Sequence, residues 1–219
     1  MRFLKKIKWA FPMLVLLMSG CGYPPLSQED DAILPSDYTY IIGPGDSVNI
    51  FVWGNPDIST SATVRPDGKI TIPLAEDLLA SGKTPSQLAR VMEKALAKYV
   101  RDPQVVIMVG GFTGVYSQQV RIIGQISGGG GGSSSSGGGG QFSARSFPYK
   151  KGMTLLDLMI QVGGLSQYAD GNRASIIRNI DGEPQHFGIK ISDLIDDADL
   201  TKNVKILPGD IVIIPEAFF

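Results

Sequence analysis

Apolar and polar residues alternate in several short stretches of the chain, and each alternation predicts a strand. Val48, Ile50 and Val52 form the first such stretch, which Asn55-Pro56 interrupts. Further along, Val64 leads into Pro66-Asp67-Gly68, and Ile70 and Ile72 follow at the same spacing. Glycine accepts the positive φ that tight turns need, so Asp67-Gly68 predicts a hairpin turn between two strands.

Two segments carry apolar residues at helical spacing behind an N-terminal cap. Thr84-Pro85 with Gln87 has the composition of a capping box with proline at the first helical position, and Asp102-Pro103 ends that segment. Thr154 with Asp157 opens the second helix, and Gly163-Gly164 stops it. The apolar faces are Leu88, Val91, Met92, Ala95, Leu96 and Tyr99 in the first helix, and Leu155, Leu158, Met159 and Val162 in the second.

The remaining strands complete two units with a similar order of elements. Residues 105–109 form an apolar strand that the first helix is expected to cover, and residues 120–123 start the second unit. The return strand is expected to begin at 147–149, with further strands at 176–177, 186–191 and 211–214 and a turn at 181–182. These patterns predict an α+β protein. Residues 38–115 form one small unit, and residues 116–219 follow the strand-strand-helix-strands order of a β-grasp domain.

One turn motif occurs twice. Pro44-Gly45-Asp46 precedes the strand at Val48, and Pro208-Gly209-Asp210 precedes the strand at Ile211. A Pro-Gly pair favours a tight turn, and the aspartate that follows can accept hydrogen bonds from nearby amides. An acid or ligand role for the aspartates is the alternative. Because each copy stands directly before an apolar strand, we interpret both copies as structural turns.

A Gly/Ser-rich insertion separates the first two strands of the second unit. Residues 128–140 are exclusively Gly and Ser, within a loop that we place at 127–145. Such a run buries no apolar area and is typical of a flexible coil. A phosphate-binding loop would need a basic or hydroxyl residue at the start of a helix, and no Gly-Lys-Ser/Thr sequence is present.

The N-terminus has the pattern of a lipoprotein signal peptide. Four basic residues precede an apolar run from Trp9 to Met18, and Ser19-Gly20 precede Cys21, the single cysteine of the chain. The apolar run is too short to span a bilayer of about 30 Å. A lone cysteine forms no internal disulfide, so the alternative is a free or buried thiol. We predict cleavage after residue 20, acylation of Cys21 and a flexible tether over 21–37.

Charge and composition exclude some functions. Removal of residues 1–20 takes away four basic side chains and leaves 16 Lys and Arg against 21 Asp and Glu. An acidic balance argues against a nucleic-acid partner. His186 is the single histidine, and no companion ligands stand at metal-binding spacing, so we expect no catalytic site, metal or cofactor. Trp53, Phe51 and Tyr40 could stack on sugar rings, but packing in a core or between subunits is the preferred interpretation.

The ordered motifs carry a family resemblance. Residues 40–48, the Arg65-Pro66-Asp67-Gly68 turn and Asp102-Pro103-Gln104-Val105 resemble the polysaccharide biosynthesis/export domain. The segment from Val120 to Pro215 is similar to a soluble-ligand-binding β-grasp domain (SLBB). The ending Ile-Pro-Glu with Phe218-Phe219 is similar to the short branch found in exosortase-linked exopolysaccharide loci.

The resemblance implies a non-enzymatic lipoprotein on the periplasmic face of the outer membrane. Its copies would form a ring that conducts exopolysaccharide outward, with an inner-membrane polysaccharide copolymerase as a partner. Longer relatives carry further β-grasp domains and a C-terminal helix that forms the pore. This sequence shows neither, so we expect a separate outer-membrane β-barrel partner.

Two other functions remain open from sequence. One is a periplasmic ligand-binding or scaffolding lipoprotein that conducts no polymer. The other is a polysaccharide-modifying enzyme, which would need two carboxyl groups about 5–10 Å apart. No candidate pair is evident in the sequence.

Overall fold

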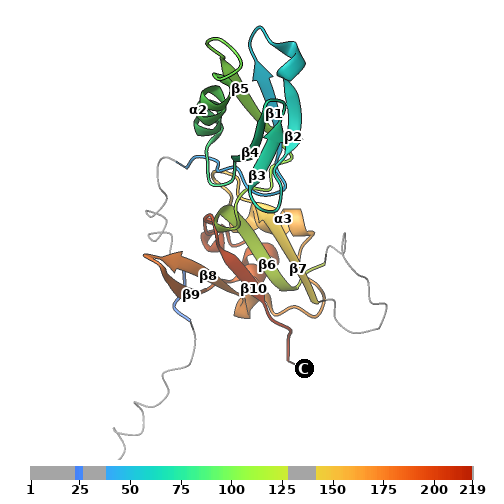
Figure 1. Ribbon diagram of the computed structural model, residues 1–219. Helices are drawn as coiled ribbons and strands as arrows, with labels where there is room; N and C mark the ends of the chain where they lie inside the picture. Colours follow the sequence, from blue (N-terminus) through green and yellow to red (C-terminus); the bar gives the residue numbers. More distant parts are fainter. Residues whose placement is uncertain (1–22, 27–37, 128–141, 219) are drawn as a thin grey trace, which may run out of the picture.

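The computed structural model describes residues 23–26, 38–127 and 142–218, so Ser19, Gly20 and Cys21 lie outside the described residues. Three α-helices and ten strands occur in these ranges, which confirms the predicted α+β class. Figure 1 shows two units, one above the other. The first contains β1 to β5 with α2, and the second contains β6 to β10 with α3 and α4. We call residues 111–118 between them the connector.

The first unit is built on a small antiparallel sheet of order β2-β1-β5. It consists of β1 (Ser47–Val52), β2 (Thr60–Thr63) and β5 (Val105–Gly110). A separate ribbon pairs β3 (Lys69–Ile72) with β4 (Ala75–Leu79). Helix α2 (Pro85–Leu96) shares one buried cluster with one face of this sheet. The cluster is Ile42, Val48, Ile50, Val52, Val64, Ile70, Ile72, Ala75, Ala80, Leu88, Ala89, Met92, Leu96 and Val105.

The predicted turn at Asp67-Gly68 is present, but it does not join a hairpin. The Gly68 amide donates to the Arg65 carbonyl at 2.8 Å, and Gly68 has φ +80°. The strands on either side pair elsewhere, β2 with β1 and β3 with β4. Strand β4 was not predicted, because its sequence Ala-Glu-Asp-Leu-Leu lacks strand-forming residues.

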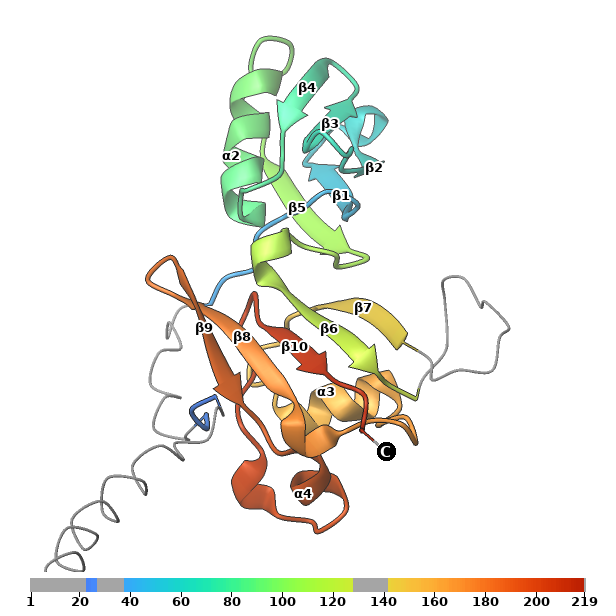
Figure 2. The same cartoon turned by 90° about the horizontal axis from the view of Figure 1, so that it is seen from below.

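The second unit has a five-stranded sheet of order β7-β6-β10-β8-β9, in which only the β10–β6 pair is parallel. Its strands are β6 (Gln119–Gln125), β7 (Phe142–Pro148), β8 (Ser175–Ile180), β9 (Glu183–Gly188) and β10 (Ile211–Ile214). Helices α3 (Leu155–Val162) and α4 (Ile191–Ile195) complete the unit. Seen from below, α3 lies beneath β6 and β10 (Figure 2).

A close backbone approach joins β6 to β10. A Cβ atom at Gly124 would lie 1.9 Å from the Ile214 carbonyl oxygen, and Gly124 has φ +134°. Glycine is therefore required at this position. The core around it comprises Val120, Ile122, Ile126, Leu155, Leu158, Met159, Val162, Ile176, Ile191, Ile206, Val212 and Ile214, together with several peripheral side chains.

Two strand boundaries in the second unit differ from prediction. Strand β7 ends at Pro148 and does not begin at Phe147, so residues 142–145 of the expected insertion belong to the strand. The strand expected over 186–191 ends at Gly188, and α4 follows from Ile191. Ile189 and Ile191 alternate as in a strand, yet both are buried beside helix α3 in the core of the unit. Periodicity alone does not distinguish these cases over so few residues.

The capping box predicted at Thr84 and the cap predicted at Thr154 are both confirmed, and the second is also a capping box. The Thr84 and Thr154 side chains accept from the amides of Gln87 and Asp157, and each partner side chain accepts from the threonine amide in return. Gly163 ends α3 with φ 83°, as the sequence predicts. Four short 3-10 segments are also present: Pro56–Ile58, Tyr116–Gln118, Gly171–Arg173 and Leu200–Lys202.

Residues 23–26 pack against the second unit, so the expectation of a free tether does not extend to them. The Leu26 amide donates to the Gly188 carbonyl at 3.2 Å, and the Gly188 amide donates to the Pro24 carbonyl at 2.8 Å. Pro25 forms a parallel bridge with Gly188, and Leu26 is buried in the core of the second unit. Pairing with an edge strand far along the chain leaves no local periodicity in the sequence.

Within the described ranges, none of the helices has both the length and the apolar character needed to cross a bilayer.

Candidate functional site

The first Pro-Gly-Asp turn holds a buried carboxylate, that of Asp46, where the two units join. Asp46 is fully buried, and its Oδ2 accepts from the Gly43 amide at 2.8 Å and from the Tyr40 hydroxyl at 2.6 Å. Its Oδ1 accepts from the amides of Thr113 and Gly114 at 2.7 and 3.0 Å. Four donors thus satisfy the carboxylate, and two of them belong to the connector.

The geometry of the turn depends on close backbone packing. A Cβ atom at Gly43 would lie 2.1 Å from the backbone of Gly114, so only glycine fits there. Burial raises the pKa of the Tyr40 hydroxyl, and its hydrogen bond to Asp46 and the charge of Asp46 raise it further. Tyr40 therefore stays a donor to Asp46 well above neutral pH.

Two glutamines extend the same joint. The Gln118 side chain accepts from the Ile41 amide and donates to the Thr39 carbonyl, both at 3.0 Å. Gln119 Nε2 donates to the carbonyls of Thr113 and Gly114 at 3.2 and 3.4 Å. Backbone and side chains together therefore tie the connector to both units.

The second Pro-Gly-Asp turn lies on the other side of the connector. A Cβ atom at Gly209 would lie 3.0 Å from the Ser117 carbonyl oxygen. Asp210 is 1 % exposed and pairs with the buried Arg178: Nε donates to Oδ1 at 3.0 Å and a terminal nitrogen donates to Oδ2 at 2.8 Å. The Leu207 amide also donates to Oδ2, at 2.8 Å. Burial raises the pKa of Asp210, while the guanidinium of Arg178 and the Leu207 amide oppose the rise.

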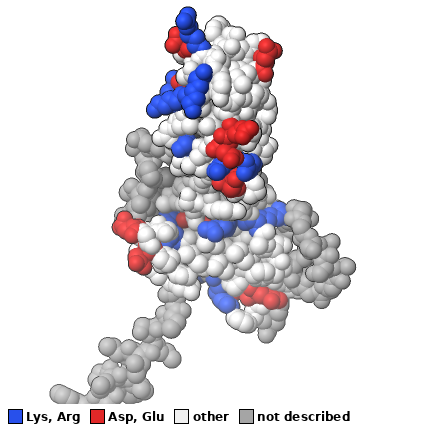
Figure 3. All heavy atoms as spheres, in the orientation of Figure 1, with Lys and Arg blue, Asp and Glu red and all other residues white. Residues whose placement is uncertain are grey.

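The third predicted turn, at Asp67-Gly68, is solvent-exposed and is flanked by ion pairs. Arg65 pairs with Asp67 at 2.5 Å and with Asp77 at 2.7 Å, and all three side chains are about half exposed. Pairs at this exposure contribute little stability. Figure 3 shows acidic and basic side chains intermixed on the face in view, without a broad field of one sign.

The aromatic side chains that the sequence assigned to packing divide into two groups. Tyr40 is partly buried at the joint, whereas Trp53 is 72 % exposed and Phe51 is 41 % exposed. Phe51 lies on the face of β1 that points away from α2, and Trp53 follows the end of that strand; their ring centroids are 6.1 Å apart at 76°. Val106 and Met108 of β5 stand opposite Phe51 and Asn49 and are also exposed. Neither Phe51 nor Trp53 is part of a core.

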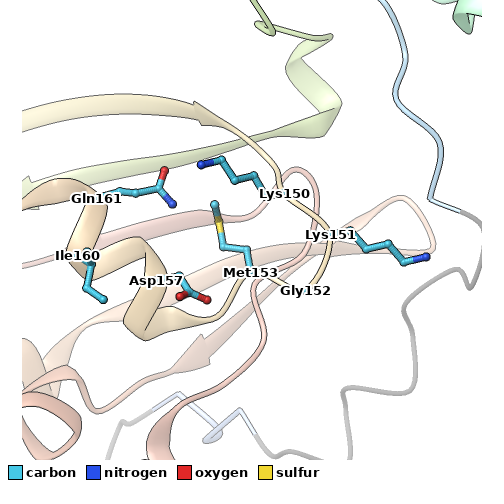
Figure 4. A pocket seen from close by; sticks show the side chains of 7 residues that line it. All are labelled: Lys150, Lys151, Gly152, Met153, Asp157, Ile160 and Gln161. Atoms are coloured by element: carbon cyan, nitrogen blue, oxygen red, sulfur yellow. The ribbon is translucent and has the colours of Figure 1, made fainter.

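A pocket of about 290 Å³ opens beside the start of α3. Its lining comes from the loop before the helix and from the first two turns: Lys150, Lys151, Gly152, Met153, Asp157, Ile160 and Gln161. In Figure 4 the side chains of Lys150 and Gln161 extend towards one another, and Lys151 points away. Hydrogen bonds from Thr154 lower the pKa of Asp157, whose carboxylate caps the helix. This volume is at the small end of ligand pockets.

In the described ranges, no three His, Cys, Asp or Glu side chains gather closely enough to hold a metal ion. His186 is exposed on β9 and stacks on Tyr23, with ring centroids 5.1 Å apart. The sequence reasoning missed Arg178, Gln118 and Gln119. A basic residue at the centre of an apolar strand was the available signal for Arg178. The glutamines gave none.

Comparison with known proteins agrees with the motifs. Residues 34–110 match the family described as polysaccharide biosynthesis/export protein, a range that includes β1 to β5, α2 and Asp46. The chain is similar to the EPS I polysaccharide export outer membrane protein EpsA of Ralstonia solanacearum, at 26% identity over 74% of this chain. The chain spans 45% of the length of that curated relative.

The match of residues 34–110 and the similarity to this relative therefore support the resemblance to the polysaccharide export family that the motifs at 40–48, 65–68 and 102–105 indicate.

Proposed function

We propose that this protein is a non-enzymatic component of exopolysaccharide export, held at the periplasmic face of the outer membrane by a lipid on Cys21. The observation that carries the proposal is the match of residues 34–110 to the export family. The curated relative, named as an export outer membrane protein, supports the same location. The signal-peptide pattern before Cys21 supports export from the cytoplasm and anchoring.

The two units fit different parts of this role. The first unit is the export domain, whose copies form a ring around the polymer in transit. The second unit has a five-stranded mixed sheet with α3 packed against it, which supports its interpretation as a β-grasp domain of the SLBB type. An inner-membrane polysaccharide copolymerase is the partner expected to deliver the chain.

The anchor and the second unit are neighbours along the chain. One residue, Gly22, separates Cys21 from Tyr23, which stacks on His186, and residues 24–26 pair with β9. An acylated Cys21 would therefore hold the β9 edge of the second unit close to the membrane. Several acyl chains on one cysteine give stable anchoring, at about 0.8 kcal/mol per buried CH₂. A Cys21→Ser variant should leave the membrane fraction, whereas Ser127→Cys, which adds a thiol elsewhere, should remain there.

Deletion of the gene tests the export role. Surface exopolysaccharide should be lost while lipid-linked precursors continue to be made, and a plasmid copy should restore it. Unchanged surface polymer in the deletion strain contradicts the proposal. Cleavage of the native polymer by the purified protein would instead support an enzyme.

A ligand-binding scaffold is the second candidate, and the pocket beside α3 favours it. Light scattering on the detergent-solubilised protein separates the two. A ring has the mass of a large homo-oligomer, and a scaffold that conducts no polymer has the mass of a monomer or dimer. Loss of export in a Lys150→Glu variant of normal oligomeric mass would point to the pocket.

A further inference from the structure

The outer face of the small sheet carries several large apolar side chains that are exposed to solvent. Its side chains come from alternate positions of β1, from Trp53 directly after that strand, and from the residues of β2 and β5 that pair with β1. We call the exposed side chains Asn49, Phe51, Trp53, Ser61, Val106 and Met108 the uncharged face. The opposite face of the same sheet is buried beneath α2.

The uncharged face is too apolar to be ordinary surface. Val106 and Met108 are 54 % and 53 % exposed, beside Phe51 and the more exposed Trp53. Contiguous exposed apolar side chains usually mark a binding surface. The polar groups of these six side chains are neutral: the Asn49 amide, the Ser61 hydroxyl, which donates to Asn49 Oδ1, and the indole N–H of Trp53. The face thus combines aromatic rings with neutral hydrogen-bonding groups.

We propose that the uncharged face binds the sugar rings of the exopolysaccharide during export, an inference that rests on the proposed export role. A pyranose ring has an apolar face of C–H groups that packs on an aromatic ring, and hydroxyl groups around its edge. Trp53 and Phe51 offer the rings, and Asn49 and Ser61 offer an amide and a hydroxyl that exchange hydrogen bonds with sugar hydroxyls. The lack of charged side chains on the face matches the neutral C–H surface of a sugar ring.

The position of the face favours a sugar chain over a second protein. The whole face lies within the residues that match the export family, and none of it belongs to the second unit. Phe51 belongs to β1, and Trp53 directly follows the end of the strand, where its amide donates to the Gln104 carbonyl. The two rings are therefore neighbours on the same side of the sheet. An open row of two rings provides few contacts per sugar, and weak contacts suit a chain that must keep moving.

The intrinsic fluorescence of Trp53 can report directly on binding at the uncharged face. The chain has two tryptophans, Trp9 and Trp53, and cleavage after residue 20 leaves Trp53 alone. The mature protein, purified in detergent, is titrated with exopolysaccharide from the cells that carry the gene, with dextran and polygalacturonate for comparison. The emission of Trp53 should shift to shorter wavelength on binding of the cells' own polymer. Affinity gel electrophoresis gives the dissociation constant independently.

Variants complete the test. Trp53→Ala should weaken binding about tenfold and Trp53→Tyr should retain most of it, since a ring remains. Tyr99→Ala, which removes another exposed aromatic ring after α2, is the matched control and should bind as wild type. Circular dichroism verifies that each variant is folded, as expected for exposed positions.

Three results overturn the assignment. Wild-type binding by Trp53→Ala shows that the face does not contact sugar. If Trp53→Ala forms a smaller oligomer than the wild-type protein but binds the polymer equally well, the face instead contacts a second copy of the chain. In cells, full export by Trp53→Ala in a strain where deletion abolishes export removes this assignment and leaves the export role intact. Unchanged export in the deletion strain removes the role itself.

Discussion

The two Pro-Gly-Asp turns differ in what satisfies their buried carboxylates. Both begin alike: the amide three residues earlier donates to the aspartate Oδ2 at 2.8 Å, from Gly43 to Asp46 and from Leu207 to Asp210. Asp210 then pairs with Arg178 inside its own unit. Asp46 instead accepts from Tyr40 and from two amides of the connector.

This difference separates a turn that stabilises one unit from a turn that joins two. A guanidinium compensates the charge of Asp210, so the pair is self-contained within the second sheet. The donors to Asp46 are neutral, and half of them lie 67 or 68 residues away. The same local motif thus closes a core in one place and fixes a joint in the other.

The largest expected effect comes from breaking the buried ion pair. Asp210→Ala leaves Arg178 charged and buried, which should lower the free energy of unfolding by about 3–5 kcal/mol, measured by urea denaturation. A double variant, Asp210→Leu with Arg178→Met, should lose much less, because neither charge remains buried. Equal losses in the single and the double variant would show that the charge is not the cause.

Removal of Asp46 should cost somewhat less and act at the joint. Asp46→Ala leaves four donors without their acceptor, and we expect a loss of about 2–3 kcal/mol by urea denaturation. Limited proteolysis should then cut the connector faster. Asp67→Ala, in the exposed turn, is the matched control and should change neither quantity. If the connector of Asp46→Ala is cleaved as slowly as that of the wild-type protein, Asp46 does not hold the two units together.

The smallest effect concerns Tyr40 and depends on pH. Tyr40→Phe removes one hydrogen bond to a carboxylate, about 1.5 kcal/mol. The pKa of Tyr40 is raised above its ordinary value near 10, so above that pH the folded protein keeps a proton that the unfolded chain loses. The stability from this group is present below pH 10 and declines as pH rises above it. Tyr40→Phe should therefore flatten the decline in melting temperature between pH 9 and 11. An unaltered slope would exclude Tyr40 as its source.

The sequence predicts what local chemistry determines. Both capping boxes, the glycine end of α3 and the turns before β1 and β10 rest on neighbouring residues, and the structure has them. What the sequence missed depends on partners far along the chain. Arg178 lies 32 residues from Asp210, and β4 exists because β3 pairs with it. The binding of residues 24–26 to β9 likewise depends on an edge more than 160 residues away.

The candidate surfaces were harder to predict than the fold. A strand with alternating apolar residues predicts a buried face, but Phe51 occupies the other face of β1 and Trp53 follows directly after the strand. Their residue types suggested packing, and only the structure shows that this face of the sheet is open. The role of Asp46 was also hidden, because a turn motif does not specify which distant amides its aspartate accepts from. The acylation of Cys21 remains a prediction from sequence.

Amide hydrogen exchange of the connector tests most directly whether Asp46 joins the two units. Peptides spanning residues 111–118 should exchange slowly in the wild-type protein, because the Thr113 and Gly114 amides donate to a buried carboxylate. In Asp46→Ala these peptides should exchange at least about tenfold faster, while peptides from β6 and β10 keep their protection. Fast exchange of the connector in the wild-type protein, or equal exchange in both proteins, would contradict the joint.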